Sequence, residues 1–202
     1  MSISSTTPIA WVLRSSTIGF VVGCQVLNPD TPRFGEFVKV SVTETLQVMG
    51  VVYDVRVNDD PSVRQLILAG DLEPALILDQ RQNRLVPIEL SVLTVGYAED
   101  GNLVQNLPPQ PPISLDALHR CTPTEVVEFT THLDYLRLIL RVGQIPTDEL
   151  IIANLTQIAN HYAPERRRDF LLTAAREITK QMSNDLLRLD GILRQLRYLA
   201  DF

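Results

Sequence analysis

A proline-rich segment, Leu107–Pro112, divides the chain into two parts whose apolar residues recur with different periods. Each proline fixes its own φ and biases the residue before it away from the helical region, so the segment predicts a stiff, extended connector. Before it, β-branched and aromatic runs alternate with turn residues, and after it apolar residues recur at helical spacing. We therefore predict a β domain over residues 1–112 and a helical domain over residues 113–202.

The first part contains several short strand-like runs. Alternating or β-branched residues predict four strands and a short fifth one, at 17–27, 35–42, 46–57, 85–98 and 103–105. Turns separate these runs, and Ser62–Ala69 has the capping residues of a short helix. Because closing the sheet removes unpaired edges, the pattern favours a small antiparallel barrel.

Beyond the connector the period becomes helical. Thr122 is a predicted N-cap, with proline at the first helical position, for a helix that covers Val126–Val142. The next helix is predicted from Thr147 to about Tyr162, and another begins at Pro164.

An apolar stripe follows Pro164 in steps of three and four residues: Leu171, Ala175, Ile178, Met182, Leu186, Leu189, Leu193, Leu196 and Ala200. This spacing approaches a heptad repeat and predicts a packing seam. The seam belongs either to one long helix or to two helices broken near Ser183–Asn184. It packs either within the chain or against a second copy, so Leu189, Leu193 and Leu196 are candidate interaction residues.

Three strand-like segments and the end of the proline segment carry a resemblance to a known family. The segments are Ile18–Gly23, Phe34–Val40 and Met49–Val55, and the Pro-Pro-x-Pro-Pro run is followed by Leu115–Asp116. With these features roughly the first 120 residues resemble the HAS barrel. This is the small N-terminal β-barrel shared by HerA-type hexameric translocases and the rotary ATP synthase subunits.

The resemblance implies a role in assembly or docking. In HerA-like proteins the ATPase core supplies the phosphate loop, while the barrel helps to assemble the ring and offers a docking surface, in some members for a NurA-type nuclease. This chain has no G-x-x-x-x-G-K-[ST] loop and no G-x-G-x-x-G turn. No ATP-binding residue is therefore carried over, and no cofactor is expected.

Metal-ligating and nucleophilic residues are few and scattered. The three histidines, His119, His132 and His161, have no H-x-x-x-H spacing. Cys24 and Cys121 lie in different halves without a C-x-x-C companion. We therefore expect no metal site, no disulfide framework and no enzymatic activity.

The formal net charge of −6 argues against a protein whose whole surface binds nucleic acid. The densest basic run is Arg166-Arg167-Arg168, and three consecutive helical residues spread over more than half the circumference. The run is either a solvated helix start or a contact to nucleic acid or an acidic partner. On the second interpretation, Arg166, Arg167 and Arg168 are candidate interaction residues.

Together these patterns predict an α+β fold, in which a small N-terminal antiparallel β-barrel is followed by a C-terminal all-helical domain. We expect a non-enzymatic module for interaction or assembly that binds a protein partner or associates with itself as a homo-oligomer. The alternative is an accessory factor of a HerA-type translocase or nuclease system that acts on nucleic acid. A cytoplasmic location without membrane contact is expected, because the sequence shows neither a secretory signal nor an apolar run of about 20 residues.

Overall fold

The computed structural model describes residues 7–25, 31–57, 64, 68, 70 and 87–200. The strands are β1 (Ala10–Ser16), β2 (Gly19–Gln25), β3 (Phe37–Ser41), β4 (Leu46–Val57), β5 (Pro87–Glu99), β6 (Asn102–Val104) and β7 (Ala117–Arg120). The helices are α3 (Pro123–Phe129), α4 (Leu136–Leu140), α5 (Thr147–Ala159), α6 (Pro164–Gln181) and α7 (Leu186–Ala200). Apart from Arg64 and Leu68, the helix predicted over Ser62–Ala69 lies outside the described residues.

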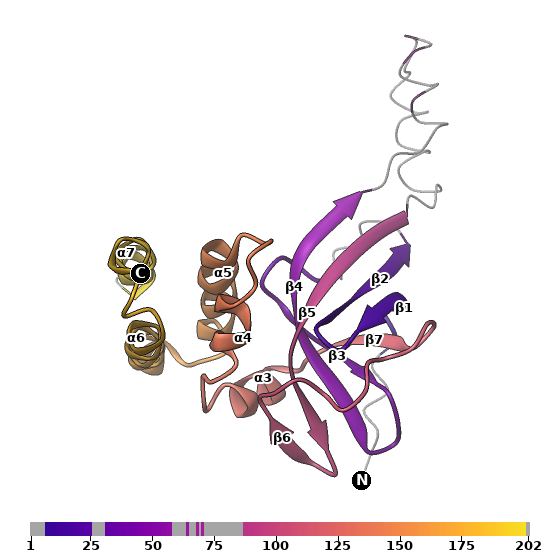
Figure 1. Cartoon of the computed structure of the whole chain (residues 1–202), viewed down its shortest axis with the longest axis horizontal. Coiled ribbons are helices and arrows are strands. Elements are labelled where there is room, and N and C mark those ends of the chain that lie inside the picture. The colour runs from indigo at the N-terminus through magenta and orange to yellow at the C-terminus, as the bar shows by residue number, and fades with distance from the viewer. Residues whose placement is uncertain are drawn as a thin grey trace.

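Six of the strands close into an antiparallel barrel (Figure 1). Their order is β2-β1-β7-β3-β4-β5, and β5 pairs with β2 to complete the circle, from Cys24 opposite Ile88 to Gly19 opposite Leu93. Strand β6 pairs with the far end of β5. The predicted antiparallel barrel and the α+β class are thereby confirmed.

The barrel interior is filled by small, branched side chains. Val38 and Val40 of β3, Val48 of β4, Leu90 of β5 and Leu118 of β7 are completely buried in one cluster. Alternate residues of each strand point inward. This period of two is the pattern from which strands are predicted in the sequence.

The barrel extends past the predicted domain boundary at residue 112. Strand β7 follows that boundary, yet it lies between β1 and β3, with Leu118 opposite both Ala10 and Val40. The helical half is therefore not entirely helical. A run of four residues is too short to show a strand period, so the sequence pattern gives no sign of β7.

The proline connector is fastened to β1. The hydroxyl of Ser15 donates a hydrogen bond to the carbonyl of Pro112 (2.5 Å), and the backbone N–H of Val12 donates one to the carbonyl of Asp116 (3.0 Å). The connector therefore brings β7 back into the sheet that the N-terminal strands form.

Helices α3, α4 and α5 lie over the outer face of β3, β4 and β5, and α6 and α7 lie on the far side of α5 (Figure 1). Phe37 of β3 packs there against Phe129 of α3 and Tyr135, with ring centroids 5.6 Å apart in both pairs. Residues from both parts of the chain belong to the same apolar cluster, which includes Val51 and Leu150. The barrel and the helices consequently share a core.

The helix predicted over Val126–Val142 is interrupted, because α3 and α4 are separate helices. The side chain of Gln105, which follows β6, stabilises the segment between α3 and α4. Its Nε2 donates hydrogen bonds to the carbonyls of Phe129 (2.6 Å) and His132 (2.8 Å), and its Oε1 accepts the N–H of Tyr135 (2.8 Å). A side chain from the barrel half thus satisfies backbone groups that a continuous helix would have paired internally.

Replacing Gln105 with alanine is expected to lower the free energy of unfolding by about 2–3 kcal/mol, since three hydrogen bonds of roughly 1 kcal/mol each are lost. Urea titration followed by circular dichroism measures the change. The matched control is Gln195→Ala on the exposed side of α7, which should alter stability by less than about 0.5 kcal/mol. Equal effects of the two substitutions would contradict the role given to Gln105.

The apolar stripe belongs to two helices, α6 and α7, which is one of the two alternatives that the sequence left open. The break falls at Ser183–Asn184, and the carboxylate of Asp185 accepts the N–H of Arg188 in the first turn of α7 (3.2 Å). Helix α7 packs on α5 and α6. Five members of the stripe, Leu171, Ile178, Met182, Leu189 and Leu196, are buried within this chain, whereas Leu186 is 70% exposed.

Candidate functional site: a groove between the barrel and helix α5

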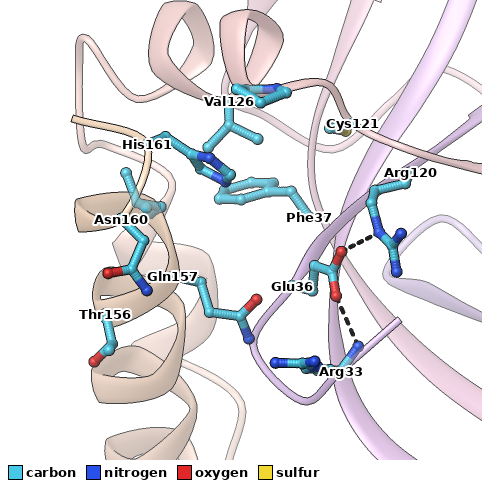
Figure 2. Close-up of a pocket in the computed structure, with 12 residues that line it drawn as sticks. Arg33, Glu36, Phe37, Arg120, Cys121, Val126, Thr156, Gln157, Asn160 and His161 are labelled. Carbon is cyan, nitrogen blue, oxygen red and sulfur yellow. Dashed lines mark hydrogen bonds and ion pairs between the residues drawn. The ribbon is translucent and has the colours of Figure 1, made fainter. Parts of the chain in front are cut away.

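A groove runs between the barrel and the C-terminal end of α5 (Figure 2). The loop before β3 forms one side, and the end of α5 with Asn160 and His161 forms the other. Arg120, at the end of β7, lies on the barrel side. The groove has a volume of about 570 Å³, which is within the range of roughly 300–1,000 Å³ found for small-ligand sites.

Buried polar contacts fix the two sides relative to each other. Asn154 of α5, which is completely buried, donates from Nδ2 to the carbonyl of Gly35 (2.8 Å) and accepts the hydroxyl of Tyr135 at Oδ1 (2.7 Å). One turn later, Gln157 Nε2 donates to the carbonyl of Phe34 (2.6 Å). The loop before β3 is thus held by α5, and the groove is preformed.

The barrel side of the groove carries two arginines and one carboxylate. Glu36 accepts the backbone N–H of Arg33 at Oε2 (2.9 Å) and forms an ion pair with Arg120 through Oε1. Among the described residues, no acidic side chain pairs with the guanidinium of Arg33. Two arginines and one glutamate leave the lining with an excess of one positive charge.

The floor of the groove is apolar. Phe37 and Val126 are buried there at 3% exposure each, with Ile158 beside them in the lining. The thiol of Cys121 is also buried, and burial raises its pKa far above the ordinary range. Because the thiolate is the nucleophilic form, Cys121 contributes to the lining as a small apolar side chain.

Glu125 lies close to the groove, but its side chain already caps the start of α3. It forms a capping box with Thr122 and an ion pair with Lys39. Burial disfavours the charged form of Glu125, but the hydrogen bonds from Lys39 and Thr122 outweigh this effect and hold its pKa below the ordinary value. The groove can therefore hold an anionic group near Arg33 and Arg120 while an apolar group rests on its floor.

The predicted arginine run lies outside this groove. Arg166, Arg167 and Arg168 are in the first turns of α6 and do not form a single surface. The guanidinium of Arg167 donates from Nε to the carbonyl of Ala159 (3.2 Å), whereas Arg166 and Arg168 are exposed. The run therefore supplies a contact to the end of α5 and two solvated side chains.

The predicted leucines are part of the chain's own core. Leu189 and Leu196 are 6% and 2% exposed, and Leu193 packs against the same cluster while partly buried. The two buried leucines are thus taken up by contacts within the chain. Of the three histidines, only His161 lines the groove.

Sequence reasoning did not select Arg33 and Arg120 as site residues. Arg120 meets Glu36 across 84 positions of sequence, and the pairing of β3 with β7 brings them together. Since β7 has no visible strand pattern, no signal in the sequence could have placed Arg120 beside this loop.

A second surface, which we call the β1 face, consists of Trp11, Leu13, Ile113 and Leu115. Strand β1, which carries Trp11 and Leu13, lies on the side of the barrel away from α6 and α7 (Figure 1). Trp11 and Leu13 are 43% and 47% exposed, and Ile113 and Leu115 are 67% and 77% exposed. The hydroxyl of Ser114 donates to the carbonyl of Leu13 (3.1 Å), so the turn carrying Ile113 and Leu115 is held beside β1.

Leu115 has an unusual backbone conformation, with φ at +73°. Bulky residues rarely occupy this left-handed region, because the β-carbon approaches the following carbonyl oxygen. The conformation is maintained by a hydrogen bond from the N–H of Leu115 to the carbonyl of Val12 (2.9 Å). A strained backbone here presents a large apolar side chain to solvent.

No protein-family model matches this chain, and no curated protein does either. Across the part of the chain that the structure describes, there is no group of three or more His, Cys, Asp or Glu residues that could hold a metal ion. The described helices include none with the length and apolar character needed to span a membrane.

Proposed function

We propose that the protein is a non-enzymatic interaction and assembly module and that the β1 face is its docking surface. The observation that carries the proposal is the strong exposure of Ile113 and Leu115 next to Trp11 and Leu13. Protein interfaces bury apolar and aromatic side chains gathered in one place, and tryptophan is among the residues that contribute most to binding. The barrel, with its filled interior, is the rigid support for this face.

The conformation of Leu115 supports the same proposal. A leucine at positive φ costs about 1–2 kcal/mol, and its exposed side chain gains little from burial in the isolated chain. Strained residues tend to occur at functional sites. A partner that covers Leu115 would supply the burial that the fold does not.

The resemblance to the HAS barrel also supports a role in assembly or docking. The alternative, an accessory factor of a translocase or nuclease system acting on nucleic acid, has less support. Arg167 is turned toward Ala159, and the net charge of the chain is −6. An interaction module that binds a protein, or a second copy of itself, is therefore our preferred function.

The proposal is tested by affinity capture with quantitative mass spectrometry, together with sedimentation of the purified protein. The baits are the wild type, the double variant Ile113→Asn/Leu115→Asn, and the control Leu187→Asn, whose leucine is 91% exposed on α7. We expect at least tenfold loss of a captured partner, or loss of self-association, with the double variant alone. Identical capture and identical mass for all three baits would overturn the proposal.

Replacing Leu115 with asparagine is expected to raise the free energy of unfolding of the isolated protein by about 0.5–1 kcal/mol, because asparagine tolerates positive φ better than leucine. Urea titration measures the gain. Ile113→Asn is the control, since Ile113 is similarly exposed but has no positive φ. If both substitutions destabilise equally, the strain at Leu115 has no energetic consequence.

A further inference from the structure

We infer that the groove between the barrel and α5 binds an acidic segment of a partner protein, in which a Glu or Asp side chain stands next to an apolar one. This site goes beyond the proposed docking surface and does not depend on it, because none of the four β1-face residues lines the groove.

Charge is the first reason. The guanidinium of Arg33 has no acidic partner among the described residues, although Glu36 is only three positions away. Both carboxylate oxygens of Glu36 are already used, by the N–H of Arg33 and by Arg120. Arginine presents a planar fork of donors that suits a carboxylate, so Arg33 is the group that an incoming carboxylate would pair with.

The apolar floor is the second reason. Phe37, Val126 and Ile158 line the same groove as the arginines, so the part of the lining beside the charged groups is apolar. A volume of about 570 Å³ accommodates a short peptide segment rather than a folded element. A carboxylate followed by an aromatic or aliphatic side chain matches both parts of the groove.

The arrangement favours a protein carboxylate over a nucleic-acid backbone. A phosphate backbone presents a charge at every nucleotide and is bound by a track of basic residues. Here the positive charge is confined to Arg33 and Arg120, with His161 on the opposite side (Figure 2). Arg166 and Arg168 do not extend the groove.

The test uses the full-length, isotope-labelled protein and two blocked peptides, acetyl-Gly-Glu-Phe-Gly-amide and acetyl-Gly-Gln-Phe-Gly-amide, titrated by heteronuclear NMR. We expect the glutamate peptide to shift the amide resonances of Glu36, Phe37, Cys121 and His161. The glutamine peptide should bind at least tenfold more weakly. Arg33→Gln should reduce the affinity for the glutamate peptide at least tenfold, and Arg33→Lys should give an intermediate loss.

Arg141→Gln is the matched control, because Arg141 is exposed at the end of α4 and does not line the groove. Its affinity for the glutamate peptide should equal that of the wild type, and the dispersion of the spectra shows that each variant is folded. Equal binding of the two peptides, or unchanged binding by Arg33→Gln, would overturn the inference. Inorganic phosphate binding more tightly than the peptide with the same dependence on Arg33 would also overturn it, in favour of a simple anion site.

Discussion

Alanine in place of Gly35 is expected to lower the free energy of unfolding by about 3 kcal/mol. Gly35 has φ at +84°, where a β-carbon costs about 1–2 kcal/mol. A β-carbon built there would lie 2.8 Å from the carbonyl carbon and Cβ of Ala153 and from the backbone nitrogen of Asn154. These atoms belong to α5 and cannot move aside without repacking the joint between helix and barrel, which adds about 1–3 kcal/mol.

Urea unfolding monitored by circular dichroism measures the loss. The control is Gly191→Ala in the middle of α7, where an added β-carbon meets nothing within 4 Å. That change should stabilise the protein by up to about 1 kcal/mol, because alanine has a higher helix propensity than glycine. If Gly35→Ala were neutral or stabilising, α5 could not lie as close to the loop as the structure places it.

The strands that the sequence predicted best are long and contain many buried apolar residues. β4 covers Leu46–Val57, the predicted range, and β5 covers Pro87–Glu99, which overlaps the predicted range 85–98. In both strands most buried positions are aliphatic residues or methionine, over a run that is long enough to recognise.

The strands that the sequence did not predict have few buried residues. In β1 only Ala10 and Val12 are buried, and the remaining five residues are exposed. In β7 only Leu118 is buried. Their positions are determined by pairing with neighbours that are distant in sequence, which no local pattern records.

The residues of the groove could not be predicted from local sequence patterns either. The arginine run at Arg166–Arg168 was conspicuous because its members are adjacent in sequence, yet they point in different directions on α6. Arg120 is isolated in the sequence, yet the pairing of β7 with β3 places it beside Glu36, which follows Arg33 by three residues. A run of charged residues in the sequence is therefore a weaker indication of a binding site than charged residues that the fold brings together.

The seam formed by α6 and α7 yields the second large expected effect. Substitution of Leu189 by aspartate should lower the free energy of unfolding by about 4 kcal/mol, because a carboxylate would enter a cluster in which Leu189 is only 6% exposed. Helix content should fall at temperatures where the wild type is folded. Circular dichroism measures the helix content, and sedimentation in the same preparation measures the mass.

Leu187→Asp is the matched control for Leu189→Asp, since Leu187 is two residues away on α7 but 91% exposed. It introduces the same charge into the same helix, and it should change stability by less than about 0.5 kcal/mol. If Leu189→Asp keeps its helix content and only dissociates an oligomer, Leu189 contacts a second copy. If helix content is lost while Leu187→Asp behaves like the wild type, the seam holds α7 against α5 and α6 of its own chain. That second outcome is the one that the burial of Leu189 predicts.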